Sequence, residues 1–171
     1  SGNLLVSYSI APQDGSSETL SIKNEGTGTG EISVSGTTVS FEGSTIGTVD
    51  GTLNGVGGDI KVNFSTSSAT SLAVEALINA VQYENTSNAP DTTSRSFIFA
   101  LNDGDGGTSS DESISFGINA QNDNPSLSSL SGGDFIEDSG EVFVVEPQNA
   151  QVVDVDLGNF DSGSITATFS S

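Results

Sequence analysis

Short stretches in which apolar and polar residues alternate recur along this chain, separated by turns rich in glycine and small polar residues. The first stretch places Leu4, Val6, Tyr8 and Ile10 on one face. A period of two residues is typical of a β-strand that buries one face. The same pattern recurs at residues 20–22, 32–34, 39–41, 46–49, 60–64, 97–101 and 114–118. Short strands separated by such turns predict an antiparallel sandwich or barrel.

One segment departs from this pattern. Residues 71–83 carry apolar side chains at helical spacing, with Leu72 and Ala76 in one row and Ala73 and Leu77 in the next. The spacing predicts an amphipathic helix of about three turns. We expect its apolar stripe to pack on the strands as a lid rather than to bind a partner. The predicted fold is therefore an all-β antiparallel β-sandwich with one short helix packed on it.

Acidic residues dominate the charge of the chain, because 3 Lys and Arg residues face 23 Asp and Glu residues and the formal net charge is -20. Such a chain repels phosphate backbones and anionic lipids, which argues against binding to nucleic acid or to a membrane surface. It attracts cations, and a solubilising acidic surface, a set of divalent-cation sites, or both together account for this composition. No apolar run approaches the roughly 18 residues of a membrane span, so we expect no membrane insertion.

The chain contains no Cys and no His. The common zinc sites, thiol chemistry and activation of a nucleophile by a Ser-His-Asp triad are therefore excluded within it. A glycosidase would need two carboxylates held across a cleft. The candidates Glu75 and Glu84 lie on or beside the predicted helix, where nothing holds them at such a separation. We therefore expect no enzymatic activity.

The run NDGDGG at residues 102–107 is the first candidate cation site. Its alternating Asp and Gly residues bring Asp103 and Asp105 close together and let the backbone curl so that carbonyl groups point inward. Calcium takes six to eight oxygen ligands of this kind. The alternative is a hairpin turn, since Asp-Gly is a favoured hairpin dipeptide.

A second candidate is the run Asn122, Asp123, Asn124 and Pro125. Three side chains with oxygen ligands, closed by a rigid proline, suit a calcium-bound joint between two β modules. An Asx turn between two strands is the alternative, because Asn and Asp hydrogen-bond their own backbone in turns. Beyond the joint, residues 142–145 and 151–155 again predict strands.

A weak internal repeat links the two ends of the chain. Residues 162–170 match residues 1–9, with Gly163 at the place of Gly2, Ile165 at that of Leu4 and Phe169 at that of Tyr8. We interpret the chain as a fragment of a tandem array. Residues 1–125 form the body of one module without its own first strands. Residues 126–171 form the first strands of the following module, and we expect them to complete the fold of residues 1–125 in the same or a neighbouring chain.

Three longer runs carry a resemblance to a known family. These are ALINAVQYENTSNAP, RSFIFALNDGDGGTSSDESISFGINAQNDNP and VVDVDLGNFDSGSITATF, at residues 76–90, 95–125 and 152–169. Together they resemble the cadherin-like tandem repeats of very large bacterial RTX adhesins exported by type I secretion. The resemblance implies an Ig-like, cadherin-like sandwich that acts as a calcium-stiffened extender at the cell surface during adhesion and biofilm formation. The implied partners are neighbouring modules, with a cell-surface glycan or protein as a further candidate.

The resemblance also implies a set of calcium ligands. These are Asn122, Asp123 and Asn124 at the joint, Asp154 and Asp156 in the following module, Asp103 with Asp105 as its helper, and Glu137 in a first strand. Ala120 stands where animal cadherins usually have an Asp, and no Asp-Arg-Glu run precedes Phe97, so we expect fewer ions than at an animal cadherin junction.

Two arrangements of these ligands follow from the two interpretations of the tail. If residues 126–171 complete the first module, Asp103, Asp154 and Asp156 converge on one cation. If they begin a separate module, Asp154 and Asp156 face residues 122–124 instead.

A calcium-dependent carbohydrate-binding module is the alternative function. It would need exposed aromatic side chains to stack on sugars. The chain has no Trp and only two Tyr residues, Tyr8 and Tyr83, and most of its aromatic residues lie at strand positions typical of a core.

Overall fold

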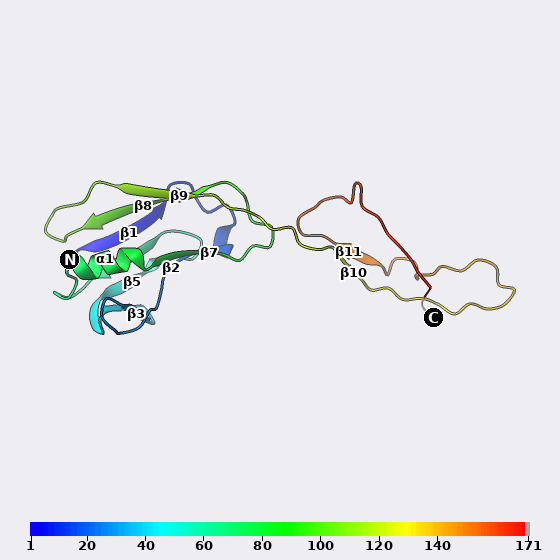
Figure 1. Ribbon diagram of the computed structural model, residues 1–171, viewed down its shortest axis with the longest axis horizontal. Coiled ribbons are helices and arrows are strands. Elements are labelled where there is room, and N and C mark those ends of the chain that lie inside the picture. The colour runs from blue at the N-terminus through cyan, green and yellow to red at the C-terminus, as the bar shows by residue number, and fades with distance from the viewer. Residues whose placement is uncertain (170–171) are drawn as a thin grey trace. The chain divides into compact units, whose positions relative to one another are not determined.

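The computed structural model describes residues 1–169, in which the chain forms two compact units (Figure 1). Unit 1 comprises Ser1–Ala120, and unit 2 comprises Gln121–Ser171. The division falls just before the predicted joint at Asn122. No helix within residues 1–169 combines the length and the apolar character that crossing a membrane requires.

Unit 1 is built on a seven-stranded antiparallel sheet with the strand order β3-β4-β5-β6-β1-β8-β9. Its strands are β1 (Asn3–Tyr8), β3 (Ile32–Ser35), β4 (Thr38–Phe41), β5 (Ser44–Asn54), β6 (Ile60–Phe64), β8 (Arg95–Asn102) and β9 (Glu112–Phe116). Strand β1 pairs with β6 on one side and β8 on the other, so that Val6 lies opposite both Ile60 and Phe99. Leu4 and Val6 are buried as their alternation predicts, because they share one face of β1.

A second layer covers part of this sheet. Strands β2 (Glu18–Ile22) and β7 (Val81–Asn85) form a two-stranded antiparallel sheet, and η1 (Gly15–Ser17) is a short 3-10 helix before β2. In Figure 1 the helix α1 (Ser71–Asn79) lies on the same side as β2 and β7. Leu20, Ala73 and Leu77 from this layer join the core formed by the larger sheet. The predicted all-β sandwich with one short packed helix is confirmed.

The helix begins where the sequence predicts and ends earlier. Thr70 caps its first turn, since its hydroxyl oxygen accepts a hydrogen bond of 3.3 Å from the backbone N–H of Ala73. The prediction of a helix over residues 71–83 was too long, because residues 81–85 form β7. In that strand Val81 and Tyr83 share one face and pack against the core.

The two predicted apolar rows of α1 are buried to different extents, since Ala76 of the Leu72 row is only partly buried against the core. Ala73, Val74 and Leu77 are buried, whereas Leu72 is 62% exposed. The lid role of the helix is therefore carried by Ala73 and Leu77, which lie four residues apart on the same face.

Unit 2 contains much less regular structure. Strands β10 (Ser126–Ser128) and β11 (Gln151–Val153) form a two-stranded antiparallel sheet. The strand predicted at residues 142–145 is not formed, and residues 162–169 of the internal repeat contain no strand either. Ser170 and Ser171 lie outside the described residues. An apolar segment forms a stable strand only when it pairs with another strand and packs on an apolar surface.

Candidate functional site

The NDGDGG run begins at Asn102, the last residue of β8, and its remaining residues form a tight loop. One carboxylate oxygen of Asp103, Oδ1, accepts hydrogen bonds from the backbone N–H groups of Asp105 at 2.8 Å and Gly107 at 3.0 Å. The backbone N–H of Asp103 in turn donates to the carbonyl of Gly107 at 3.1 Å. These hydrogen bonds lower the pKa of Asp103 below its usual value and keep it ionised. Asp105 itself is exposed. Asp103 thus organises the turn through one oxygen and leaves the other without a hydrogen bond in the described structure.

The second cluster lies within unit 2, where the pairing of β10 with β11 brings the joint next to Asp154. Ser126 lies opposite Val153, and Leu127 lies opposite Val152. Continuing this antiparallel register places Pro125 beside Asp154. The joint and the Asp154 to Asp156 turn therefore lie at the same end of this small sheet, although they are separated along the chain.

Side chains connect the two segments at this end. The backbone N–H of Asp123 donates to Oδ2 of Asp156, and Oδ1 of Asp154 accepts from the N–H groups of Asp156 at 3.0 Å and Leu157 at 3.1 Å. The Asn122 amide donates to the carbonyl of Asp123 at 2.8 Å. Asp154 and Asp156 are both partly buried, whereas the joint residues are exposed.

This geometry corresponds to one of the two arrangements expected from the sequence, in which Asp154 and Asp156 face residues 122–124. Each of the two carboxylates retains one oxygen that makes no hydrogen bond within the described residues, namely Asp154 Oδ2 and Asp156 Oδ1. Oxygen donors of this type fit calcium, which accepts carboxylate, amide and backbone oxygens in flexible geometry.

The remaining predicted ligands make no hydrogen bond to this cluster within the described residues. Glu137 lies in an exposed turn of unit 2, and neither its carboxylate nor the side chain of Asn124 hydrogen-bonds to any described residue. Asp103 and Asp105 belong to unit 1. Across residues 1–169, no three acidic side chains gather in a geometry that already forms a metal cage.

A buried ion pair that sequence reasoning missed connects the two sheets of unit 1. Arg95 begins β8 in the larger sheet, and Glu18 begins β2 in the smaller one. The guanidinium donates from Nη2 to Glu18 Oε1 at 2.7 Å and from Nε to Oε2 at 2.9 Å. Asp14 adds a second carboxylate at 3.1 Å from Nη2. The only sequence signal was that the chain has a single Arg at the edge of an apolar strand.

The environment of this pair explains its charge state. The side chain of Arg95 is 2% exposed and that of Glu18 is 0% exposed. Burial by itself raises the pKa of Glu18, but hydrogen bonds from Arg95 and from the backbone N–H of Asp14 outweigh it and keep the pKa below its usual value. The hydrogen bonds to Glu18 raise the pKa of Arg95 further, so both groups are charged.

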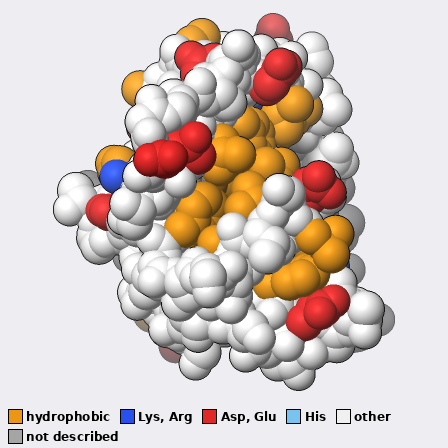
Figure 2. Space-filling model, turned by 90° about the vertical axis from the view of Figure 1, so that its left-hand side faces the viewer, with side chains coloured by type: hydrophobic (Ala, Val, Ile, Leu, Met, Phe, Trp, Pro, Cys, Tyr) orange, Lys and Arg blue, Asp and Glu red, His pale blue; other side chains and the backbone are white. Residues whose placement is uncertain are grey.

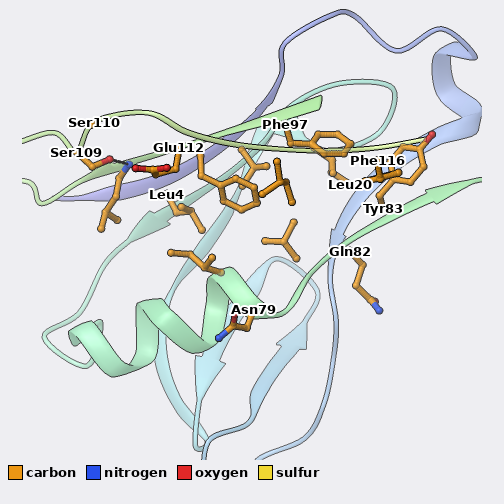
Figure 3. A pocket seen from close by; sticks show the side chains of 16 residues that line it. Leu4, Leu20, Asn79, Gln82, Tyr83, Phe97, Ser109, Ser110, Glu112 and Phe116 are labelled. Atoms are coloured by element: carbon orange, nitrogen blue, oxygen red, sulfur yellow. Dashed lines mark hydrogen bonds between the residues drawn. The ribbon is translucent and has the colours of Figure 1, made fainter. Parts of the chain in front are cut away.

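An apolar groove in unit 1 lies between the larger sheet and the layer of α1 and β7. Its volume is about 660 Å³. Figure 3 shows side chains entering it from the strands above and from the helix and β7 below. Figure 2 shows hydrophobic side chains gathered in a hollow on one face, with acidic side chains along its border. Among the residues that line the groove are Leu4, Ile78, Tyr83, Phe97, Ile114 and Phe116.

The aromatic side chains of the groove contact one another. The ring of Phe116 lies 5.2 Å from that of Tyr83 and 5.6 Å from that of Phe97, measured between centroids. The hydroxyl groups of Tyr8 and Tyr83 are buried and make no hydrogen bond of good geometry within the described residues. The Tyr83 hydroxyl lies near Glu18, and burial raises the pKa of this tyrosine.

Comparisons of the chain with protein-family models, with curated proteins and with solved structures found no match.

Proposed function

We propose that this chain is a calcium-stiffened extender module of a large bacterial adhesin, located outside the cell at its surface and acting in adhesion and biofilm formation. Calcium binds where the joint at residues 122–124 meets Asp154 and Asp156. The chain has a structural role without catalysis, and its partners are the neighbouring modules of the same polypeptide.

The observation that carries this proposal is the contact between the Asp123 backbone and the Asp156 carboxylate. It brings the joint, whose one acidic residue is Asp123, next to the turn that carries Asp154 and Asp156. Asp154 and Asp156 each keep one carboxylate oxygen that makes no hydrogen bond within the described residues. Two carboxylates about 4 Å apart repel each other by about 1 kcal/mol even at the dielectric constant of water. A divalent cation turns this repulsion into attraction and ties the joint to the turn after β11.

The acidic composition supports the same proposal. A formal charge of -20 attracts cations to the whole surface, and extracellular calcium sites typically bind with dissociation constants of roughly 0.1–1 mM. At a free calcium concentration about ten times the dissociation constant, each site adds about 1.4 kcal/mol of stability by mass action.

The test is isothermal titration of calcium into the whole chain, together with hydrogen exchange measured in about 5 mM calcium and in excess chelator. We expect calcium to slow exchange at residues 122–128 and 151–157, because it fixes both segments to one ion. Asp154→Ala and Asp156→Asn should weaken binding by about tenfold or more.

Asp161→Asn is the matched control. Asp161 lies in the same unit, is exposed, and loses the same charge on substitution, so calcium binding should stay close to wild type. Binding that survives both Asp154→Ala and Asp156→Asn would contradict the site. An absence of calcium binding would refute the function and leave the Asp and Asn clusters as turns.

A further inference from the structure

At several places in this chain an Asn or Asp stands directly before a glycine. These pairs are Asn54-Gly55 and the Asp-Gly pairs at residues 14–15, 50–51, 103–104 and 105–106. In such a pair the backbone nitrogen of the glycine can attack the side-chain carbonyl carbon, Cγ, of the residue before it. The attack closes a five-membered ring, and glycine has no side chain to obstruct it. It needs an accessible side chain and a free glycine N–H, so the fold decides which pair reacts.

Asn54-Gly55 is the most labile pair by residue type, because Asn is thermolabile. The fold holds both of its reacting groups. The Gly55 N–H donates to the carbonyl of Asp59 at 2.9 Å, and Oδ1 of Asn54 accepts from the N–H of Val56 at 3.1 Å. Gly55 is buried, and its carbonyl accepts from the N–H of Leu20 at 2.9 Å. Attack at Asn54 therefore requires local opening of unit 1.

Hydrogen bonds also hold the carboxylates of the first two Asp-Gly pairs. Oδ1 of Asp50 accepts from the N–H groups of residues 52 and 53 at 2.9 and 3.1 Å, and its Oδ2 accepts from the Asn63 amide at 3.0 Å. Oδ2 of Asp14 accepts from the Arg95 guanidinium at 3.1 Å. Neither carboxylate is free to turn toward the following glycine.

The two Asp-Gly pairs in the loop after β8 differ from each other. The Gly104 N–H donates to Oδ1 of Asn102 at 2.9 Å, and Asp103 accepts the two backbone hydrogen bonds described above. In contrast, neither the carboxylate of Asp105 nor the N–H of Gly106 makes a hydrogen bond within residues 1–169. Both residues are exposed, and a Cβ placed on Gly106 would meet no atom within 4 Å.

We propose that Asp105-Gly106 is a site of spontaneous modification, at which Asp105 is converted to isoaspartate in the folded chain. The Gly106 nitrogen forms a bond to Cγ of Asp105. The amide proton and the hydroxyl group of the carboxyl leave as water, and the product is a cyclic succinimide. One water then opens the ring, either at Cγ, which restores Asp105, or at the main-chain carbonyl carbon, which gives isoaspartate. Water is the only co-reactant, and the mass of the chain does not change.

The modification alters the turn between β8 and β9. In isoaspartate the main chain runs through Cβ and Cγ of residue 105, so it is longer by one methylene group. Asp103 organises this turn through hydrogen bonds from the N–H groups of Asp105 and Gly107, which lie on either side of the inserted atom. The longer chain changes the spacing of these two donors, so we expect the turn to loosen. The site lies in unit 1 and the reaction needs no calcium, so it stands apart from the function proposed above.

The test is prolonged incubation of the whole chain in chelator at neutral pH, below its unfolding temperature. Peptide mapping by a fragmentation method that distinguishes isoaspartate from aspartate then gives the rate at each pair. A parallel sample unfolded in urea gives the rates without the fold. In the folded chain, isoaspartate should form at residue 105 at least about tenfold faster than at residues 14, 50 and 103. Asn54 should react fastest in urea and should fall behind Asp105 in the folded chain.

Asp105→Glu is the matched control. It keeps the negative charge, but the same attack would have to close a less favourable six-membered ring. Hydrogen exchange at residues 103–107, measured before and after the incubation, reports the state of the turn. Exchange should become faster in the incubated wild type and should stay unchanged in the incubated Asp105→Glu chain.

Equal rates at the four Asp-Gly pairs of the folded chain would overturn the proposal, as would modification of Asp105 that occurs only in urea. A folded chain in which Asn54 reacts as fast as in urea would show that the hydrogen bonds of Gly55 give no protection. Unchanged exchange in a wild-type chain that carries isoaspartate would refute the loosening of the turn.

Discussion

Replacing Arg95 by Met should destabilise unit 1 more than any other single loss of a positive charge in this chain. The guanidinium makes two hydrogen bonds to Glu18, at 2.7 and 2.9 Å, and further ones to Asp14 and to the backbone carbonyls of Thr93 and Asp91. Met fills a similar volume but leaves the Glu18 carboxylate, which is 0% exposed, without its cation.

The expected loss follows from this burial. Removing one partner of a buried ion pair typically costs about 3–5 kcal/mol, because the other charge stays out of water. Domains of this size have unfolding free energies of roughly 5–15 kcal/mol, so the variant would be close to the limit of stability. Glu18→Gln combined with Arg95→Met should regain part of the loss. The Gln amide oxygen can still accept hydrogen bonds from the backbone of Gln13 and Asp14, as Glu18 does, without a buried charge.

Tyrosine fluorescence during urea unfolding is a suitable assay. Both tyrosines, Tyr8 and Tyr83, lie in unit 1 and the chain has no Trp, so the signal reports this unit alone. The control is Lys23→Met, which removes the same charge from a pair with Glu25. That pair has a separation of 3.5 Å and side chains that are 55% and 32% exposed. Surface pairs contribute at most about 1 kcal/mol.

The pH dependence gives an independent check. The pKa of Glu18 is lowered in the folded state, so its contribution is full above its unfolded value and is lost as the pH falls through the folded value. The stability difference between the wild type and Arg95→Met should therefore be full at neutral pH and should shrink below about pH 4.3. The reasoning fails if Arg95→Met costs no more than Lys23→Met, or if the difference does not change with acidification.

Two further predictions concern the packing of unit 1, and the same urea assay measures both. Gly55→Ala should destabilise by about 1–3 kcal/mol more than Gly36→Ala. Both glycines have positive φ, but a Cβ at Gly55 would lie 1.9 Å from the carbonyl oxygen of Leu20, whereas the space around Gly36 is open. Equal losses of stability in the two variants would refute the close approach of Gly55 to the Leu20 carbonyl. Leu77→Ala, at 0% exposure, should cost about 2–5 kcal/mol, and Leu72→Ala, at 62%, should cost less than about 1. Similar costs would contradict the observed orientation of α1.

The local periodicity of apolar residues was sufficient to predict most strands and the helix of unit 1. The alternation at residues 4–8 and 60–64 predicted strands that form as β1 and β6, because a one-sided strand has a period of two wherever it lies in a sheet. The helix was predicted from its spacing, but its end was not. Residues 81–83 continue a helical pattern and also fit a strand, and pairing with β2 decides between them.

The candidate calcium ligands were also named from local runs, since clusters of Asp and Asn are visible without a fold. Whether Asp156 meets the joint could not be known from these runs, because the two segments are separated by 33 positions and approach only through the pairing of β10 with β11. The assignment of calcium to this cluster stays a prediction that the binding experiment tests.

The β-type alternations, the one helical segment and the strong acidity depend only on neighbouring residues and on composition, so they can be read without a fold. Which of these segments form stable elements depends on contacts between residues far apart in the chain. Arg95 contacts Glu18, which lies 77 positions away in the chain, because β8 and β2 belong to the two layers of the sandwich. Residues 142–145 remain without a partner strand, since a strand forms only where another backbone supplies its hydrogen bonds and an apolar surface covers its face.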